Sequence, residues 1–158
     1  MVVRGTPATI AAIEEVYRRR YSRFLRVARA TLGDDDRARD AVQEAFARAI
    51  RSRFDYRGEG SLEAWLWRTL VNVCTDERRR VEPRAEPARN GRAEEWPEVR
   101  AAVAALPERQ RLALFLRHYA DLEYESIAAV LGVERGTVAA TLHAAHESLR
   151  RTLTEVAR

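Results

Sequence analysis

The chain has 158 residues, 46% hydrophobic and 33% charged, which suffices for one domain or two small ones with their own cores. All 28 basic residues are arginine, and the net charge of +4 is compatible with nucleic-acid binding without requiring it. The single cysteine, Cys74, excludes an internal disulfide and a CxxC metal site. Alanine and arginine dominate the composition, which favours helices. No apolar run approaches a membrane span and no signal peptide is recognisable, so we expect a cytoplasmic protein with no membrane insertion.

Two amphipathic helices are predicted first. Apolar residues recur every three or four positions over residues 10–32, and the Gly-Asp-Asp-Asp segment at 33–36 ends this helix and caps the next. The second helix has an apolar side running from Ala38 to Ile50. Its polar side carries Asp40, Gln43 and Glu44, which, taken alone, would be an ordinary solvated face.

A glycine-rich, charged loop at 53–61 precedes a third helix that ends in three arginines at 78–80. Aromatic residues interleaved with arginines suit single-stranded nucleic acid, because bases stack on rings while guanidinium groups follow phosphates. Trp65 is predicted to lie in the core, and Trp67, two positions later, to point to the surface. The terminal arginines equally fit a cluster favoured by the helix dipole, so both interpretations stay open.

Residues 81–98 are predicted to be a flexible linker, rich in proline and charge. Four further helices are predicted at about 97–105, 107–120, 123–131 and 135–152. The last two form a helix-turn-helix around a turn glycine, with these apolar residues spaced to pack them: Ile127, Ala128, Leu131, Val133, Val138 and Leu142.

The second helix of such a unit normally enters the major groove, with Arg or Lys on the phosphates. Between Gly136 and Leu149 there is no basic residue other than histidine. Residues 1–80 hold 17 arginines against 12 acidic residues, whereas residues 99–158 hold 8 against 7. The positive charge therefore belongs to the first domain, and the helix-turn-helix is expected to bind DNA weakly or to bind something else.

Catalytic and metal-binding motifs are not found. The three histidines, His118, His143 and His146, have no cysteine or carboxylate partners at metal-ligand spacing, and we interpret them as non-ligands. Nucleophile–base pairs, phosphate-binding glycine loops and HExxH are missing as well. We expect no catalytic residues, no metal, no cofactor and no enzymatic activity.

Three segments carry a family resemblance: ARDAVQEAF at 38–46, RGEGSLEAWLWRTLVNVCTDERRR at 57–80, and LPERQRLALFLRHYADLEYESIAAVLGVERGTVAATLHAAHESLR at 106–150. In content and order they resemble the extracytoplasmic-function (ECF) sigma factors of bacterial RNA polymerase. The resemblance implies an all-α protein of two helical domains. They would be region 2 in residues 1–80 and a region 4 helix-turn-helix in 99–158, joined by the 81–98 linker.

The resemblance also implies roles for individual residues. Asp40, Gln43 and Glu44 match the helix that docks on the clamp helices of the largest polymerase subunit. The loop 56–61 with Asn72 and Asp76 matches the part that recognises the −10 element and holds a flipped base. With Trp67, singled out above, the expected −10 contacts are Tyr56, Arg57, Trp67, Asn72, Asp76, Arg79 and Arg80. The expected −35 contacts are Arg135, Gly136, Thr137, Thr141 and His143.

The chain departs from the family pattern in region 4. Ala139, Ala140 and Thr141 replace Lys-Ser-Arg, and the segment 144–147 reads Ala-Ala-His-Glu instead of Arg-Ala-Arg-Lys. Four or five cations are missing from one helix, and Glu134 is a poorer N-cap than the usual Asp or Ser. Arg39 replaces a usual Glu beside the core-binding residues.

The function expected from these patterns is that of an alternative sigma factor. It would bind core RNA polymerase and promoter DNA, assist promoter opening, and interact with an anti-sigma factor or activator. One alternative is a sigma-derived regulator whose region 4 binds an anti-sigma or activator protein rather than DNA. Another is a plain helix-turn-helix repressor, in which the QEAF helix and the Trp-rich loop would have no role.

Overall fold

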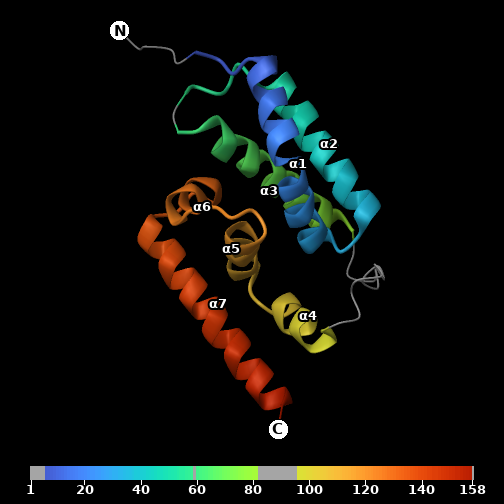
Figure 1. Ribbon diagram of the computed structural model, residues 1–158, viewed down its shortest axis with the longest axis vertical. Helices are drawn as coiled ribbons and strands as arrows, with labels where there is room; N and C mark the ends of the chain where they lie inside the picture. Colours follow the sequence, from blue (N-terminus) through green and yellow to red (C-terminus); the bar gives the residue numbers. More distant parts are fainter. Residues whose placement is uncertain (1–5, 59, 82–95, 158) are drawn as a thin grey trace. The chain divides into compact units, whose positions relative to one another are not determined.

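All regular structure in the computed structural model is helical over the residues it describes, namely 6–58, 60–81 and 96–157 (Figure 1). The chain divides into two units, Met1–Pro87 and Ala88–Arg158. The prediction of an all-helical protein with two helical domains is confirmed. None of the described helices combines the length and the apolar character needed to cross a membrane.

The described part of the first unit contains three helices, α1 (Ile10–Leu32), α2 (Asp35–Arg51) and α3 (Leu62–Arg80), each packed against the other two. The first residues of these three helices agree with the sequence signals. Each helix has a polar N-cap whose side chain accepts a hydrogen bond from the backbone N–H three residues further on. These caps are Thr9, Asp34 and Ser61. Gly33 ends α1 in the left-handed region, at φ +71°, which glycine adopts without steric cost.

An aromatic cluster forms the centre of this unit. Trp67 is fully buried and stacks on Phe24, with ring centroids 4.0 Å apart. Phe24 meets Phe46 edge-on at 5.1 Å, and Phe46 meets Tyr17 edge-on at 4.8 Å. The four rings tie α1, α2 and α3 together, since each helix contributes at least one of them. The indole Nε1 of Trp67 has no hydrogen-bond partner among the described residues, which costs about 1–3 kcal/mol.

The predicted placement of the two tryptophans is wrong. Trp67, expected at the surface, is in the core, and Trp65, expected in the core, is only half-buried. The cause is the width of the buried face of α3, which packs against two helices rather than one. The buried positions are Leu66, Trp67, Leu70, Val71, Val73 and Cys74. A single apolar stripe accounts for only part of this set. Because Trp67 is buried, it is not available as a −10 contact.

Within residues 96–157, the second unit contains four helices, α4 (Pro97–Ala104), α5 (Glu108–His118), α6 (Tyr124–Leu131) and α7 (Arg135–Val156). The predicted linker 81–98 lies mostly outside the described residues, and α4 begins inside its last two positions. Gly132 ends α6 at φ +66°, as the turn of a helix-turn-helix requires. The following helix, α7, continues four residues past the predicted end at 152.

Buried side chains hold α7 to its neighbours. Val138, Leu142 and Ala145 are its buried residues, and α7 packs against α4, α5 and α6. Ala145 therefore belongs to the core, while Ala139 and Ala140 are exposed. One alanine of α7 is therefore a buried packing residue, and others lie on the surface.

Arg111 is a buried charged residue that the sequence did not distinguish from its neighbours. Its Nη1 donates to the carbonyl oxygens of Ala104 (3.0 Å) and Leu106 (3.2 Å), at the end of α4 and in the turn that follows. The guanidinium of Arg111 is charged, and it donates to backbone carbonyls at and just after the end of α4, which lack a partner within the helix. These hydrogen bonds stabilise the connection between α4 and α5. Arg111 is a structural residue of the α4–α5 junction.

Candidate nucleic-acid interface

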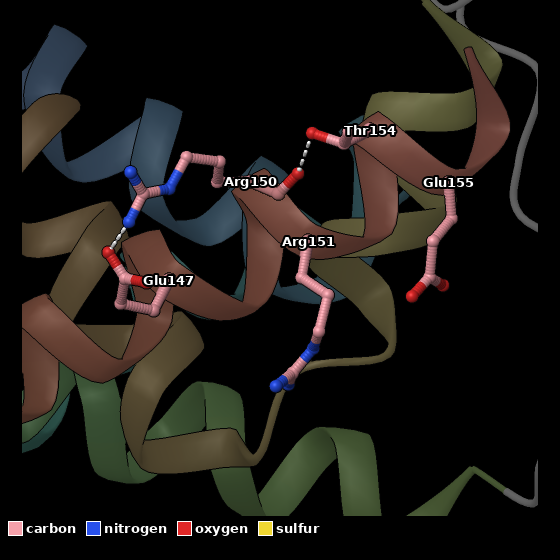
Figure 2. A pocket seen from close by; sticks show the side chains of 5 residues that line it. All are labelled: Glu147, Arg150, Arg151, Thr154 and Glu155. Atoms are coloured by element: carbon pink, nitrogen blue, oxygen red, sulfur yellow. Dashed lines mark hydrogen bonds and ion pairs between the residues drawn. The ribbon is translucent and has the colours of Figure 1, made fainter. Parts of the chain in front are cut away.

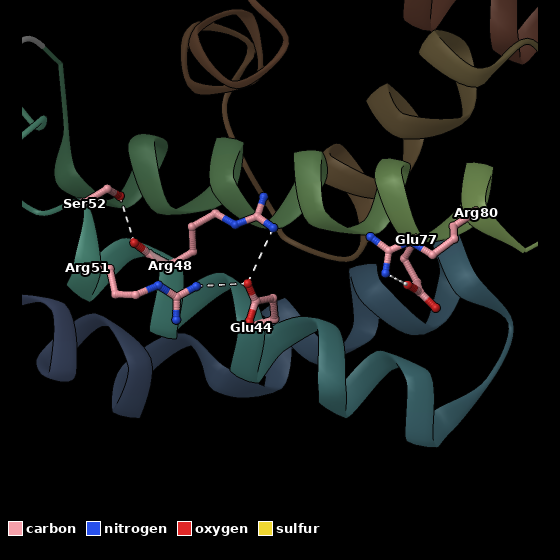
Figure 3. A network of polar contacts seen from close by, with 6 residues as sticks. All are labelled: Glu44, Arg48, Arg51, Ser52, Glu77 and Arg80. Carbon is pink, nitrogen blue, oxygen red and sulfur yellow. Dashed lines mark hydrogen bonds and ion pairs between the residues drawn. The ribbon is translucent and has the colours of Figure 1, made fainter.

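The polar face of α2 presents the side chains that the sequence singled out. Asp40 and Gln43 are exposed, and Glu44 is partly exposed. The carboxylate of Glu44 lies 3.1 Å from Arg51 and 3.5 Å from Arg48 (Figure 3). Exposed ion pairs of this kind contribute about 0–1 kcal/mol each. A partner's cations can therefore replace these two arginines at small cost.

Arg39 lies beside this face but is engaged locally. Its Nη1 forms an ion pair with Asp36, one turn earlier in α2, at 3.0 Å. Asp36 also lies in the first turn of the helix, where a carboxylate is favoured by the helix dipole. The arginine that departs from the family pattern is therefore already balanced by a neighbouring acid.

The loop between α2 and α3 is arranged around Tyr56. Its hydroxyl donates to the carbonyl of Gly60 at 2.9 Å, and its ring lies 5.6 Å from that of Trp65. Gly58 and Gly60 have φ values of +73° and +78°, a conformation that residues with side chains rarely adopt. The loop thus presents a partly exposed pair of aromatic rings at the start of α3.

A polar stripe continues from this aromatic pair along α3. Trp65, Arg68, Asn72, Asp76 and Arg79 follow one another at steps of three and four, so they share one side of the helix, opposite its buried face. Asn72, Asp76 and both arginines are exposed. The structure thus places the predicted residues Asn72, Asp76 and Arg79 on one side of α3, with Tyr56 beside Trp65 at its start.

Two further predicted −10 contacts lie at the margins of this stripe. Arg57 is exposed in the loop, and Arg80 is exposed at the end of α3. The guanidinium of Arg80 lies 3.8 Å from the carboxylate of Glu77 (Figure 3). Trp65 was not among the predicted contacts, because its position on the apolar side suggested a core residue.

In the second unit, the first turn of α7 is open. Arg135, Gly136 and Thr137 are exposed, and Glu134 at the N-cap makes no side-chain hydrogen bond to the backbone. The first N–H groups of α7 are therefore left available to an outside acceptor such as a phosphate oxygen. The expected N-cap weakness of Glu134 is confirmed.

A groove of about 500 Å³ lies between the start of α5 and the first half of α7. Its lining side chains are mostly small or hydroxylated. They are Pro107, Arg109, Gln110, Gly136, Thr137, Ala140, Thr141 and Ala144. Three of the predicted −35 residues lie here, whereas Arg135 and His143 do not line the groove. Its one cation, Arg109, comes from α5, and the sequence analysis did not select it.

A second cationic spot surrounds Tyr124 at the start of α6. The guanidinium carbons of Arg117 and Arg135 lie 5.7 Å and 5.9 Å from the centre of its ring. Arg117 also donates to the carbonyl of Leu122 at 3.0 Å, which holds it in place. Arg135 is thus the only one of the predicted −35 contacts that brings a permanent positive charge, and Arg117 was not predicted.

Comparison with known proteins finds relatives of both units. The chain matches Sigma-70 region 2 over residues 16–84 and Sigma-70, region 4 over residues 97–149. It is 32% identical to the ECF RNA polymerase sigma factor SigE of Mycolicibacterium smegmatis, in a match covering 92% of this chain and 63% of that protein. It is 30% identical to the ECF RNA polymerase sigma factor SigM of Mycobacterium tuberculosis, with 90% and 77% covered. The chain belongs to the ECF sigma factors.

Two solved structures share the fold of this sigma factor. One is CnrH in complex with the cytosolic domain of CnrY, with a TM-score of 0.76 and 22% identity over 94% of this chain and 91% of the other. The second is RpoE in complex with the anti-sigma factor NepR from Bartonella quintana, with a TM-score of 0.70 and 21% identity over 89% and 96%.

The C-terminal end of α7 does not restore the cations that region 4 of this sigma factor lacks. Arg150 pairs with Glu147, and its carbonyl accepts a hydrogen bond from Thr154 at 2.7 Å (Figure 2). Arg151 points away from this pair, and Glu155 follows one turn later (Figure 2). Two acids offset the two arginines, so this end of the helix is close to neutral.

A thiol and an imidazole are among the described groups whose pKa values are shifted. Burial, with a smaller effect of Glu77, raises the pKa of the Cys74 thiol to about 12, so this thiol stays protonated and unreactive near neutral pH. Burial lowers the pKa of His118, and nearby His146 and Arg117 lower it further. Neither Cys74 nor His118 lines the groove between α5 and α7.

Proposed function

We propose that this sigma factor binds core RNA polymerase through the exposed face of α2 and recognises the −10 element through α3 and the preceding loop. One observation carries the proposal. The half-buried pair Tyr56–Trp65 stands at the head of the polar stripe of α3, while α2 of the same unit presents a separate polar face with Asp40, Gln43 and Glu44. A plain helix-turn-helix repressor would have no use for either surface.

The arrangement of the loop suits capture of an unstacked base. Extruding a base from the duplex costs a few kcal/mol. Stacking on an aromatic side chain contributes about 1–3 kcal/mol per base, which is of the same order. Asn72 offers both a donor and an acceptor to a base edge, and Arg79 and Arg80 lie further along the helix for phosphates. Promoter opening then follows from binding energy, without covalent chemistry.

Region 4 is proposed to make a weak −35 contact. Gly136, Thr137 and Thr141 allow close approach of the DNA backbone to α7, while Arg109, Arg117 and Arg135 supply the charge. Each phosphate contact contributes about one unit to the salt dependence of binding. Because α7 lacks four or five cations of the family pattern, most of the affinity for promoter DNA would come from region 2.

A second candidate function follows from the same neutral surface. Region 4 would bind a protein, an anti-sigma factor or activator, in place of DNA. The exposed Ala139 and Ala140 and the groove beside them are small and uncharged, which suits a protein partner better than a polyanion. RpoE, which shares the fold, was solved with an anti-sigma factor.

Core polymerase acts in the cytoplasm. The proposed function therefore implies a cytoplasmic location for this protein.

Transcription in vitro with purified core polymerase tests the proposal. Core with this protein is expected to produce transcripts from defined start sites, and the protein is expected to co-elute with core. The double variant Asp40→Arg/Glu44→Arg is expected to lose co-elution. Its stability should change little, since exposed substitutions rarely exceed about 0.5 kcal/mol.

The matched control is Glu14→Arg/Glu15→Arg on α1, which changes the net charge by the same amount at two exposed positions. It is expected to leave co-elution intact. Unchanged binding of the α2 variant to core would contradict the assignment of this face. Duplex DNA binding without core, together with no transcript, would favour a repressor.

A further inference from the structure

Two histidines that are far apart in the sequence meet on the surface of region 4. His118 ends α5 and His146 lies in the second half of α7, and both are exposed. Their ring centroids are 5.7 Å apart, with the ring planes at 68° to each other. Neither imidazole takes part in a hydrogen bond or ion pair in the described part of the chain. Two exposed imidazoles in contact are not needed for packing and remain open to a ligand.

Sequence spacing gave these histidines no partner and predicted that they are not ligands, but the contact between their rings changes that interpretation. We propose that His118 and His146 form a two-histidine chelating site for a divalent transition-metal ion, with Zn²⁺ as the reference case. A zinc–imidazole nitrogen bond is about 2.0–2.1 Å long, which places the ring centroid about 3.2 Å from the metal. Two such rings at a tetrahedral angle have centroids about 5.2 Å apart. The observed 5.7 Å is about half an ångström larger, so the spacing of the two rings is close to that of a chelating pair.

The donor set defines the kind of ion. Imidazole nitrogen suits zinc, copper and nickel, whereas magnesium and calcium require oxygen ligands. No group of three or more metal-binding side chains is found among the described residues, so water would complete the coordination. Arg117, which precedes His118, adds nearby positive charge, while the carboxylate of Glu147 is paired with Arg150. The site is therefore an exchangeable one of moderate affinity.

A bound ion would change region 4 in two ways. It would join the end of α5 to α7, and any ligand that binds only the folded state raises its stability. It would also place two positive charges on a helix that has no Arg or Lys between residues 136 and 149. Metal would thus bring charge to the part of the protein where permanent cations are missing.

Titration of the full-length protein with ZnCl₂ or NiCl₂ tests this site by calorimetry and by thermal unfolding. One ion per chain is expected to bind, with a rise in Tm that chelation by EDTA reverses. His118→Ala and His146→Ala are each expected to weaken binding at least tenfold, because even outer-shell partners of a metal ligand are worth about 10–100-fold. Copper bound to the protein should show nitrogen hyperfine structure from two imidazoles.

The third histidine supplies a matched control, since His143 is also exposed on α7 but is not part of the pair. His143→Ala is expected to bind metal as the parent does. Equal loss in all three variants would show non-specific binding to surface histidines and overturn the proposal. No binding by the parent, or unchanged binding by His118→Ala and His146→Ala, would also overturn it. None of these measurements depends on polymerase or promoter DNA, so their outcome is independent of the proposed function.

Discussion

The two regions of this sigma factor place their charge differently. In region 2 the buried aromatic cluster and the polar stripe lie on opposite sides of α3, and the stripe retains two arginines, an amide and a carboxylate. In region 4 the side of α7 that lines the groove carries only glycine, alanine and threonine, and the cations near it come from α5 and from the first residue of α7. The same kind of helix therefore presents a charged surface in one region and a nearly neutral groove in the other.

The largest expected effect concerns the core that positions the region 2 stripe. Trp67→Ala should lower the free energy of unfolding by about 3–5 kcal/mol, because it removes the ring stacked on Phe24. Trp65→Ala should cost about 1–2 kcal/mol, because its side chain is only half-buried. Chemical denaturation curves of the two variants measure the difference.

Trp67→Phe is the control for this comparison. It keeps an aromatic ring in the cluster and removes an indole N–H that has no partner in the described residues. It should destabilise far less than Trp67→Ala. Equal destabilisation by Trp65→Ala and Trp67→Ala would contradict the assignment of one tryptophan to the core and the other to the surface.

The next largest effect is expected on DNA binding when positive charges are added to α7, so that region 4 becomes nearly as basic as region 2. The triple variant Ala139→Lys/Thr141→Arg/Ala144→Arg should strengthen binding to a −35 duplex and steepen its salt dependence by up to about three units of slope. Fluorescence anisotropy at a series of salt concentrations measures both.

Three cations at the far end of α7, in Thr152→Arg/Val156→Arg/Ala157→Arg, form the matched control, because these positions are exposed and outside the groove. A much smaller change in slope is expected from them. A steep salt slope in the unmodified protein would contradict the idea that its region 4 binds DNA weakly.

A change within the region 2 stripe should affect opening more than binding. Asn72→Ala should slow promoter opening by about five- to a hundredfold, since base contacts of this kind are worth about 1–3 kcal/mol and form only after unstacking. Permanganate reactivity of the melted segment reports the rate. Gln43→Ala, another exposed amide but on α2, should reduce core binding without this defect, and equal opening by Asn72→Ala and parent would remove Asn72 from the site.

The smallest effect is expected at Gly136. Its backbone conformation is ordinary, and an added Cβ would meet no atom within 4 Å, so Gly136→Ala should stabilise region 4 by about 0.5–1 kcal/mol. If DNA approaches the start of α7 closely, the same methyl group should weaken −35 binding. A variant that is more stable and binds DNA equally well would show that the groove is not a DNA surface.

Much of this protein follows from local sequence. The periods of three and four, the caps at Thr9, Asp34 and Ser61, and the glycines at 33 and 132 determine where helices begin and end, because each acts through neighbours within one turn. Asp40, Gln43, Asn72 and Asp76 were found on exposed helix faces for the same reason. The charge deficit of α7 is likewise visible in the sequence, since it depends on composition alone.

Other features depend on contacts between helices, and the tertiary structure decided them. The number of helices packed against α3 determines that Trp67 is buried and Trp65 half-buried, which one apolar stripe could not reveal. The packing of α4 against its neighbours turns Arg111 into a buried cap, while Arg109, two residues earlier, lines the groove. His118 and His146 are 28 positions apart and become neighbours because α5 packs against α7. Helix periodicity shows which side of a helix is apolar, but only the fold determines which residues of different helices meet.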